Sequence, residues 1–377
     1  MANLNLTWRN VTTSTFFTTS VLSCYYSTGR QNAINNWAPG ALVITIINTA
    51  NEAAGFTLND KIRLQLDDAL SPGVYYHTFW VQEITFKDLG GNQNGSTATI
   101  ICTDLLGRLG RSTVFFKNMP QARTITQLTT AFSGDLPSGA TMPATYTGTS
   151  TASLSATYTG TIANRINLNM TTEQGVVWQN QTQILLIGRD DIAGLATTTK
   201  DIGPESPYYI YSNIERVALG TEFLNTCTVS TEVTATVNST DATSVATYGI
   251  YGGTLATVDY TATQATGSAS WQVFSRSDPT AITFTVQTDT GTSSNVSDIL
   301  KNLWQAAPEL YYMVFYRKPG NSALIQYLCQ MQGFSMSISP EVTEFTFYLA
   351  PASFTGVFTL NSNVFGILDQ NILSFSW

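Results

Sequence analysis

Charged residues are scarce in this 377-residue chain, and positive charges are scarcer than negative ones. Asp, Glu, Lys and Arg make up 11% of the sequence, where a soluble domain usually carries about 25%. Lys and Arg number 17 against 25 Asp and Glu, which gives a formal net charge of −8. A protein that binds nucleic acid through its phosphates needs a surplus of positive charge. The composition therefore argues against a nucleic-acid-binding protein.

Histidine occurs once, as His77, and the cysteines Cys24, Cys102, Cys227 and Cys329 lie far apart. The cysteines therefore lack the close pairwise spacing of a metal site. A Ser-His-Asp triad could be built only on His77. Neither a Gly-x-Ser-x-Gly elbow nor a phosphate-binding Gly-x-x-x-x-Gly-Lys loop occurs. We expect the cysteines to be buried, reduced thiols and His77 to be structural. The sequence predicts no catalytic, cofactor-binding or metal-ligating residue, no cofactor, and no enzyme.

Two acidic pairs, Asp67-Asp68 and Asp190-Asp191, could supply carboxylates for glycoside hydrolysis. Adjacent strand residues point to opposite faces, however, so neither pair forms a dyad by itself, and Asp commonly begins turns after strands. Tyrosine-rich stretches at 208–211 and 311–312 could stack on sugars. Burial at a barrel seam or a subunit interface is the preferred interpretation of these tyrosines.

Long hydrophobic runs are absent. The clean apolar run at 41–47 is too short to span a bilayer, and residues 1–10 lack the basic and apolar regions of a signal peptide. We therefore expect synthesis in a cytoplasm. With 43% hydrophobic and 11% aromatic residues, the chain has enough apolar side chains for a core and does not have a disordered composition.

Period-two alternation dominates the first 117 residues. Residues 41–47 predict a strand buried on both faces and residues 61–66 a half-exposed one. Residues 74–86 and 97–102 predict two strands joined by a turn at 90–95, which contains Asn-Gly. This segment therefore predicts one antiparallel β unit.

The middle of the chain is mixed. Helices are predicted at 120–132 and 162–173, and a tight hairpin at 176–187. Between the helices, Ala-Thr-Tyr-Thr-Gly-Thr occurs at 144–149 and again at 156–161, which favours a β-hairpin or an extended loop. Residues 223–237 are rich in strand formers. The last predicted helices are 269–277 and 297–305, the second capped by Ser297.

Strands return at the end of the chain, with predictions at 281–287, 311–316, 324–331, 333–338 and 344–349. This block resembles the first one and indicates two similar barrels. The predicted fold is mainly β, with two antiparallel β-barrel domains and a smaller intervening α+β region. Its divisions are 1–117 (first barrel), 118–222 (α+β region), 223–255 with 306–350 (second barrel), 256–305 (α+β segment) and 351–377 (C-terminal extension).

Short segments spread over the chain occur in the order found in a known family. They are residues 27–31, 39–41, 46–48, 62–64, 79–86, 103–109, 172–178, 188–189, 224–226, 241–249, 333–340 and 365–371. On these segments the chain resembles the hub-type minor tail proteins of long-tailed bacteriophages, relatives of the trimeric baseplate hub of contractile phages. The resemblance implies tail-tube or hub barrels and a homotrimer that forms a pseudo-sixfold ring at the distal end of the virion tail.

The resemblance also implies partners. These are the tail tube or distal tail protein on one side and a spike, fibre or tape-measure protein on the other. Genomic DNA would pass through without specific binding, and the chain would not insert into a membrane. The alternatives are a distal tail ring protein and a tip module that binds or degrades cell-wall glycan.

The few cations and the C-terminus lead to two further expectations. Arg30, Arg108, Arg111 and Lys318 should lie at subunit contacts or on the outer surface, paired with acids such as Asp104 and Glu341, which leaves a neutral or acidic channel wall. Residues 364–377 carry too many apolar side chains to remain in solvent, so they should pack on another barrel or a neighbouring subunit. Those side chains are Phe365, Ile367, Leu368, Ile372, Leu373, Phe375 and Trp377.

Overall fold

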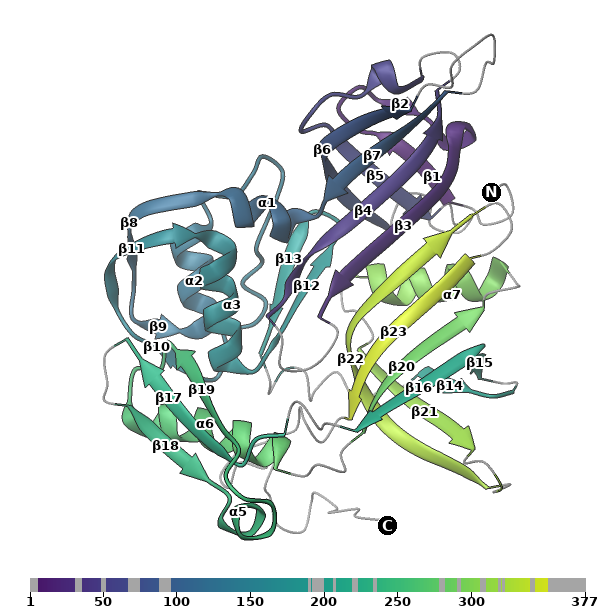
Figure 1. Ribbon diagram of the computed structural model, residues 1–377. Coiled ribbons are helices and arrows are strands. Elements are labelled where there is room, and N and C mark those ends of the chain that lie inside the picture. The colour runs from purple at the N-terminus through teal and green to yellow at the C-terminus, as the bar shows by residue number, and fades with distance from the viewer. Residues whose placement is uncertain are drawn as a thin grey trace.

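The computed structural model is mainly β and is built on one branched sheet of fourteen strands (Figure 1). It describes residues 6–30, 36–48, 52–66, 75–87, 96–188, 191, 200–205, 208–218, 223–232, 236–277, 282–289, 293–305, 310–317, 320, 323–339 and 343–351. Residues 67–68, 90–95 and 364–377 therefore lie outside the described residues, as do Asp190, Lys318 and Glu341, and the predictions for them stay predictions.

The N-terminal part of the sheet, called the first unit, has the strand order β3-β4-β7-β6-β5-β1-β2. All its strand pairs are antiparallel. The predicted strand 61–66 is confirmed as β5, with its predicted alternation of buried and half-exposed residues. The elements are β1 (Leu6–Asn10), β2 (Thr15–Phe16), η1 (Thr18–Ser20), β3 (Val21–Gly29), β4 (Ala38–Ile47), η2 (Glu52–Gly55), β5 (Lys61–Leu66), β6 (Tyr76–Lys87) and β7 (Thr97–Thr103).

The C-terminal part of the sheet, called the second unit, has the strand order β15-β14-β21-β22. A branch continues from β22 through β23 and β20 to β16. Pairing of β14 with β15 and with β21 is parallel, and the other pairs are antiparallel. The elements are β14 (Lys200–Gly203), β15 (Tyr209–Ile210), β16 (Asn213–Ala218), β20 (Ile282–Asp289), β21 (Tyr311–Arg317), β22 (Leu324–Ile338) and β23 (Thr343–Pro351).

Strand β22 joins the two units. Its first half pairs with β21, and its second half pairs with β3 along the same edge and with β23 along the other edge. The prediction of two strands, 324–331 and 333–338, is wrong, because a bulge between Met331 and Gly333 bends one continuous strand instead of ending it. In the sequence, a bulge and a turn interrupt the alternation of a strand in the same way.

The predicted pair of barrels is not confirmed. Among the described strands, the first unit has no pair that closes it into a ring. In the second unit β15 pairs only with β14 and β16 only with β20, so the ring is interrupted at Tyr211-Ser212, between these two strands. Both units are strongly curved sheets, and they share one strand, β22.

The region after β7 packs helices against two small hairpins. Helix α3 has its predicted bounds because Thr161 caps its N-terminus and Gln174, at φ 58°, ends it. The hairpin β12–β13 is also confirmed. The elements are α1 (Leu105–Arg111), β8 (Thr113–Met119), β9 (Ala122–Arg123), α2 (Thr124–Phe132), β10 (Thr151–Ala152), β11 (Ser155–Thr161), α3 (Ile162–Glu173), β12 (Val176–Asn180) and β13 (Gln183–Ile187).

The two copies of the six-residue repeat do not pair with each other. Residues 144–149 form no strand, whereas residues 156–161 belong to β11, which pairs with β8. Helix α2 begins at Thr124, four residues later than predicted, because β9 occupies the preceding residues.

Residues 223–277 form a separate lobe. It contains β17 (Thr226–Thr231), β18 (Val237–Thr240), α5 (Ala242–Tyr248), β19 (Gly252–Thr257) and α6 (Ala262–Arg276). Its strands form their own sheet, in the order β18-β17-β19. The assignment of residues 223–255 to the second barrel is therefore wrong: β17 finds both its partners within 226–257, and strand composition alone does not identify a partner.

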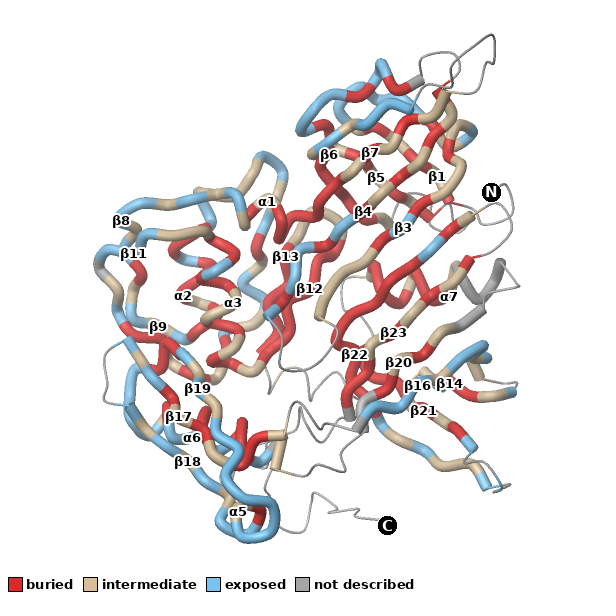
Figure 2. Tube along the Cα trace, viewed as in Figure 1, coloured by how far each residue is buried: buried red, intermediate tan, exposed pale blue. Residues whose placement is uncertain are grey.

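One apolar core underlies both units (Figure 2). Tyr26 of β3 contacts Phe79 of β6 and Phe334 of β22 edge to face. Helix α7 (Ser293–Trp304) packs behind the junction, with Trp304 near His77. Ser297 lies inside α7, so it is not the N-cap that the sequence predicted.

Two further results concern single elements. The strand predicted at 41–47 belongs to β4, but it is buried on one face only: Leu42, Ile44 and Ile46 are buried, and Val43 and Thr45 are half-exposed. Within the described residues, no helix is long and apolar enough to cross a membrane.

Candidate functional site

The side of the sheet that faces away from the core forms one surface across both units, here called the outer sheet face. Directly opposed residues on paired strands lie on the same face, so the strand registers trace its rows. One row runs from Gln287 through Thr346, Ser335 and Ser27 to Ala41. A second row runs from Glu344 through Ser337, Tyr25, Val43 and Ile101 to Glu83.

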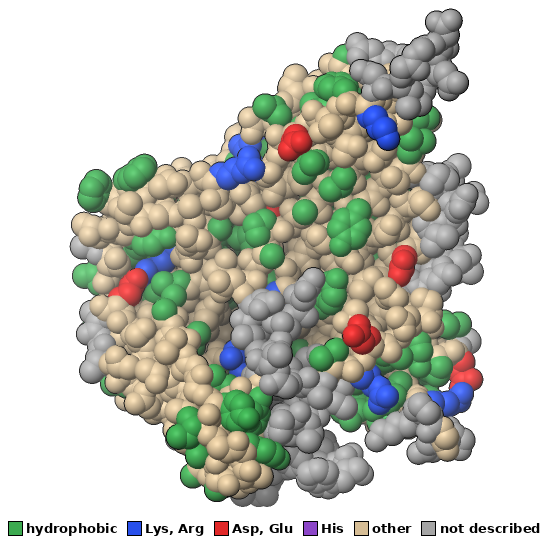
Figure 3. Space-filling model, viewed as in Figure 1, with side chains coloured by type: hydrophobic (Ala, Val, Ile, Leu, Met, Phe, Trp, Pro, Cys, Tyr) green, Lys and Arg blue, Asp and Glu red, His purple; other side chains and the backbone are tan. Residues whose placement is uncertain are grey.

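Neutral polar side chains dominate this face. Thr45, Thr99 and Thr85 form a further row on β4, β7 and β6. Among the described residues of these rows and their continuation along β6, the charged side chains are Glu83, Glu344 and Lys87. Figure 3, which views β3, β4, β22 and β23 from the front, shows few charged side chains over them. These rows offer many hydroxyl groups and little fixed positive charge.

Two glycines allow the backbones of β3 and β22 to approach each other closely where the two units join. Gly29 ends β3 at φ +84°, and a Cβ there would lie 2.5 Å from the carbonyl oxygen of Gln332. A Cβ on Gly333 would lie 2.5 Å from the carbonyl oxygen of Thr28. Because real Cβ atoms do not approach backbone oxygens so closely, only glycine fits at either position. The bulge of β22 and this glycine pair bring the two backbones together.

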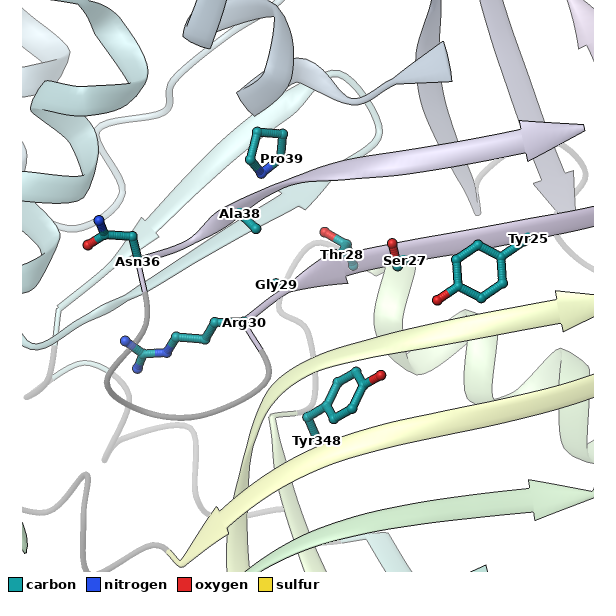
Figure 4. A pocket seen from close by; sticks show the side chains of 9 residues that line it. All are labelled: Tyr25, Ser27, Thr28, Gly29, Arg30, Asn36, Ala38, Pro39 and Tyr348. Atoms are coloured by element: carbon teal, nitrogen blue, oxygen red, sulfur yellow. The ribbon is translucent and has the colours of Figure 1, made fainter. Parts of the chain in front are cut away.

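A pocket of about 270 Å³ lies at one end of the outer sheet face (Figure 4). Arg30 extends from the end of β3 toward Asn36, and Tyr348 of β23 lines the pocket from the other strand pair. The Arg30 Nε–H donates to Gln332 Oε1 at 2.8 Å, and its guanidinium lies 4.4 Å from the ring centroid of Trp37. Burial, and secondly the nearby Arg276, lower the pKa of Arg30 to about 9. The pocket has a mixed polar and apolar lining, and Arg30 holds the start of β4 against β22.

The prediction that His77 is structural is supported by its surroundings. His77 is buried, its Nε2 lies 3.2 Å from the hydroxyl of Tyr26, and its ring packs on Phe79. Its Nδ1 has no hydrogen-bond partner among the described residues. Burial lowers the pKa of His77 to about 3, so the imidazole is neutral at physiological pH.

The cysteines are buried and free, as predicted. Burial raises the pKa of Cys24 to about 12. Within the described residues, no three His, Cys, Asp or Glu side chains are grouped as metal ligands. Tyr311 and Tyr312 are buried, and Tyr208 stacks on Phe315 at 4.6 Å, in agreement with a structural role at a seam of the second unit.

The predicted pairing of cations with Asp104 is wrong. Asp104 is buried at the N-terminus of α1, where its Oδ1 accepts the N–H of Gly107, and burial raises its pKa to about 7. The guanidinium of Arg108 donates to Asn59, and that of Arg111 donates to Gln82. Asp104 is buried because it caps α1, a helix for which the sequence gives no separate prediction.

Sequence analysis did not identify the outer sheet face as one surface. Its strands come from residues 21–47, 76–103 and 282–351, so no contiguous segment contains it. The alternation of residues 343–349, Thr-Glu-Phe-Thr-Phe-Tyr-Leu, does separate buried Phe345 and Phe347 from half-exposed Glu344 and Thr346. That alternation identifies which side chains face outward, but it does not reveal which strand lies alongside.

Comparison with known proteins gives the fold a context. Neither a protein-family model nor a curated protein sequence matches the chain. A tail protein from Neisseria meningitidis superposes with a TM-score of 0.61 at 12% identity, covering 93% of this chain and 98% of that one. The 43 kDa tail protein of prophage MuSo2 from Shewanella oneidensis gives 0.56 at 10% identity, over 93% and 99%.

A prophage tail protein from Listeria monocytogenes gives a TM-score of 0.52 at 10% identity, over 91% of this chain and 94% of that one. These similarities extend over both units, the helical region and the lobe together, so they concern the whole architecture. The resemblance to phage tail proteins that the sequence predicted is thus confirmed at the level of the fold.

Proposed function

We propose that this chain is a structural subunit of a bacteriophage tail, and that its outer sheet face lines the path of the DNA at the tail tip. The observation that carries the proposal is the continuity of that face across both units, with Glu83, Glu344 and Lys87 as the charged side chains of the rows traced on β23, β22, β3, β4, β7 and β6 among the described residues. The fold shared with three phage tail proteins over more than nine-tenths of the chain supports it.

Electrostatics favours this role. DNA that passes a wall rich in Lys and Arg is retained, because phosphate contacts release counterions and each contact adds affinity. Thr, Ser and Tyr hydroxyls are neutral, so a hydrogen bond from one of them to a phosphate displaces no counterion and exchanges readily with water. The net charge of −8 adds a weak repulsion. A wall of this composition lets DNA move past it.

The presence of two sheet units in each chain favours a homotrimer. Each chain has two curved sheet units joined side by side through β22, so three chains supply six units to a ring. Such a ring matches a sixfold tail tube on one side and a threefold tip on the other. The partners are then the tail tube or a distal tail protein above, and a spike, fibre or tape-measure protein below. The role is structural rather than enzymatic, and the location is the virion.

The oligomer is tested by native mass spectrometry of the purified chain and by cryo-electron microscopy of tails. A complex of three 41.0-kDa chains with the outer sheet faces directed inward is expected. A hexamer with one unit of each chain in the ring would instead indicate a distal tail ring protein. Specific binding of a cell-wall glycan would indicate the other alternative.

The proposal that the outer sheet face lines the DNA path is tested by adding positive charge to that face. The triple variant Thr45→Lys, Thr99→Lys, Thr346→Lys should give the oligomer salt-dependent affinity for double-stranded DNA, or slow DNA ejection. The matched control places three lysines on the exposed surface of α6, as Thr263→Lys, Thr266→Lys, Ser270→Lys. Equal DNA affinity of the two variants would contradict a lining role for the outer sheet face.

A further inference from the structure

The lobe formed by residues 223–277 ends in an exposed group of apolar side chains, here called the tip cluster. It consists of the exposed Tyr248, Ile250 and Tyr251 and the half-buried Phe223. Ile250 is 76% exposed and Tyr251 49% exposed, and the ring of Phe223 contacts both tyrosines edge to face. Figure 3 shows a group of hydrophobic side chains on the part of the lobe that contains α5. An apolar patch with no charged member is typical of an interaction site.

Polar contacts fix the backbone segment that carries the tip cluster. Helix α5 buries only Ser244, although helices in proteins usually depend on a buried face. Asn225, which is fully buried, fixes the segment that follows: its Nδ2 donates to the carbonyl of Gly249 at 2.7 Å, and its Oδ1 accepts the N–H of Tyr251 at 2.8 Å. The aromatic side chains are therefore pre-organised on the outside of the lobe, which lowers the entropy lost on binding.

The chain carries a segment suited to cover this cluster. Residues 364–377 contain seven large apolar side chains besides Val364, and Asp369 is the single charge among them. Leu373, Phe375 and Trp377 alternate with Ser374 and Ser376, which predicts an extended segment with one apolar side. Such a segment can lay that side against aromatic rings.

The connecting chain starts on the side of the second unit that faces the lobe. Strand β23 ends there at Pro351, as Figure 1 shows. Residues 352–363 can span about 40 Å when extended. A segment tethered in this way acts at an effective concentration in the mM range, so it competes strongly with any second copy of the chain.

We propose that residues 364–377 bind the tip cluster of their own chain and so tie the end of the second unit to the lobe. The contact is apolar, between alternating Leu373, Phe375 and Trp377 and the rings of Tyr248 and Tyr251. It does not depend on the proposed role in a tail, and either proposal can fail without the other.

Disulfide trapping in the full-length chain tests the contact. The native cysteines are buried, so the double variant Ile250→Cys, Phe375→Cys carries one reactive pair. Mild oxidation should form an intramolecular disulfide, seen as a linked peptide pair in a protein of monomer mass. The control Phe116→Cys, Phe375→Cys uses another residue of similar exposure, 77%, on β8, and should link at least tenfold more slowly.

Equal linking of the two pairs, or linking only between chains, would overturn the proposal. A second measurement does not require cysteines. Truncation after residue 363 should raise the fluorescence of a dye that binds apolar surfaces several-fold. Ile250→Ser with Tyr251→Ser should abolish this rise, whereas Phe115→Ser with Phe116→Ser should not. A truncated chain without the rise would contradict the contact.

Discussion

The fourteen-stranded sheet and the 223–277 lobe are both built from strands, yet they are held in different ways. The sheet shares one apolar core with the helical region and α7, and that core contains the large buried rings of Tyr26, Phe334 and Phe347. The lobe has a separate core of six residues, the largest of them Leu224. The sheet is therefore stabilised by burial over long range, and the lobe depends on its attachment.

That attachment is polar. The side chain of Arg165 on α3 is fully buried and forms an ion pair with Glu232 of the lobe at 2.5 Å, and Ser153 donates to the same carboxylate at 3.2 Å. Backbone bonds add to it: Ser153 N–H donates to Val258, and Val258 N–H donates to the hydroxyl of Thr172. Polar attachments specify one geometry but leave a surface that can separate without opening the main core. The fourteen-stranded sheet with its apolar core is here called the frame, and the lobe is a module attached to it.

The largest effect is expected inside the frame. Phe334→Ala removes a buried ring from β22, the strand that both units share, and should lower the free energy of unfolding by about 3–5 kcal/mol. Because β22 contacts β3 and β23, hydrogen exchange should increase in both units together. Leu328→Ala, at a 37% exposed position of the same strand, should cost less than about 1 kcal/mol. Loss of protection in one unit alone would contradict a shared frame.

The next effect is expected at the attachment. Arg165→Ala breaks a buried ion pair, for which losses of about 3–5 kcal/mol are usual. Here the value should fall at the lower end, because Glu232 is 34% exposed and regains water. Hydrogen exchange should increase in β17–β19, while the sheet stays protected. Arg317→Ala, which breaks an exposed pair with Glu205, should change stability by at most about 1 kcal/mol. Global unfolding of the Arg165 variant would show that the lobe is not separable.

A smaller effect concerns two buried titratable groups of the frame with opposite pH dependence. The pKa of His77 is lowered to about 3, so its contribution to the free energy of unfolding is lost as pH falls from about 6.5 toward 3. The pKa of Asp104 is raised to about 7, so its contribution is lost as pH rises from about 4 to 7. Each slope approaches about 1.4 kcal/mol per pH unit, and the two oppose each other.

Single variants should separate these slopes. Relative to the unchanged protein, His77→Phe should lose stability as pH rises from 4.5 to 6.5, and Asp104→Asn, which keeps an N-cap residue, should gain it. Urea unfolding at several pH values measures both slopes. Parallel curves for the three proteins would contradict the burial of these groups.

The smallest effect is expected on the outer sheet face. Thr346→Lys changes a half-exposed position on β23, so its effect on stability should stay within about 0.5 kcal/mol. A thermal unfolding curve measures this. A large loss would mean that the face is packed against part of the same chain, which would rule it out as an open wall.

Elements with local signals were predictable. Helix α3 has a capping Thr161 and a helical spacing of apolar residues, and β5 alternates over six residues, so each was found with its bounds. The hairpin β12–β13 needed only a short turn between two apolar runs. The prediction that His77 is structural rests on its aromatic neighbours in sequence, and its burial against Tyr26 and Phe79 supports it.

Elements whose role depends on distant partners were not predictable. Asp104 resembles any acid after a strand until α1 forms behind it. The bulge in β22 resembles a turn until β3 and β23 are placed on its two edges. Residues 226–257 have the composition of barrel strands, yet they pair among themselves. In each case the deciding interaction joins residues that are not neighbours in sequence.

The sequence by itself determined a charge-poor, mainly β protein with buried thiols, no clustered catalytic motif and alternating strands with neutral outward positions. These properties follow from the composition and from the two-residue alternation of strands, which depend only on residues that are close in sequence. Only the tertiary structure decided that β22 unites two curved units, that their outward positions form one face, and that residues 223–277 stand apart as a lobe. Strand order depends on contacts across hundreds of residues, and such contacts are selected by the packing of the whole core.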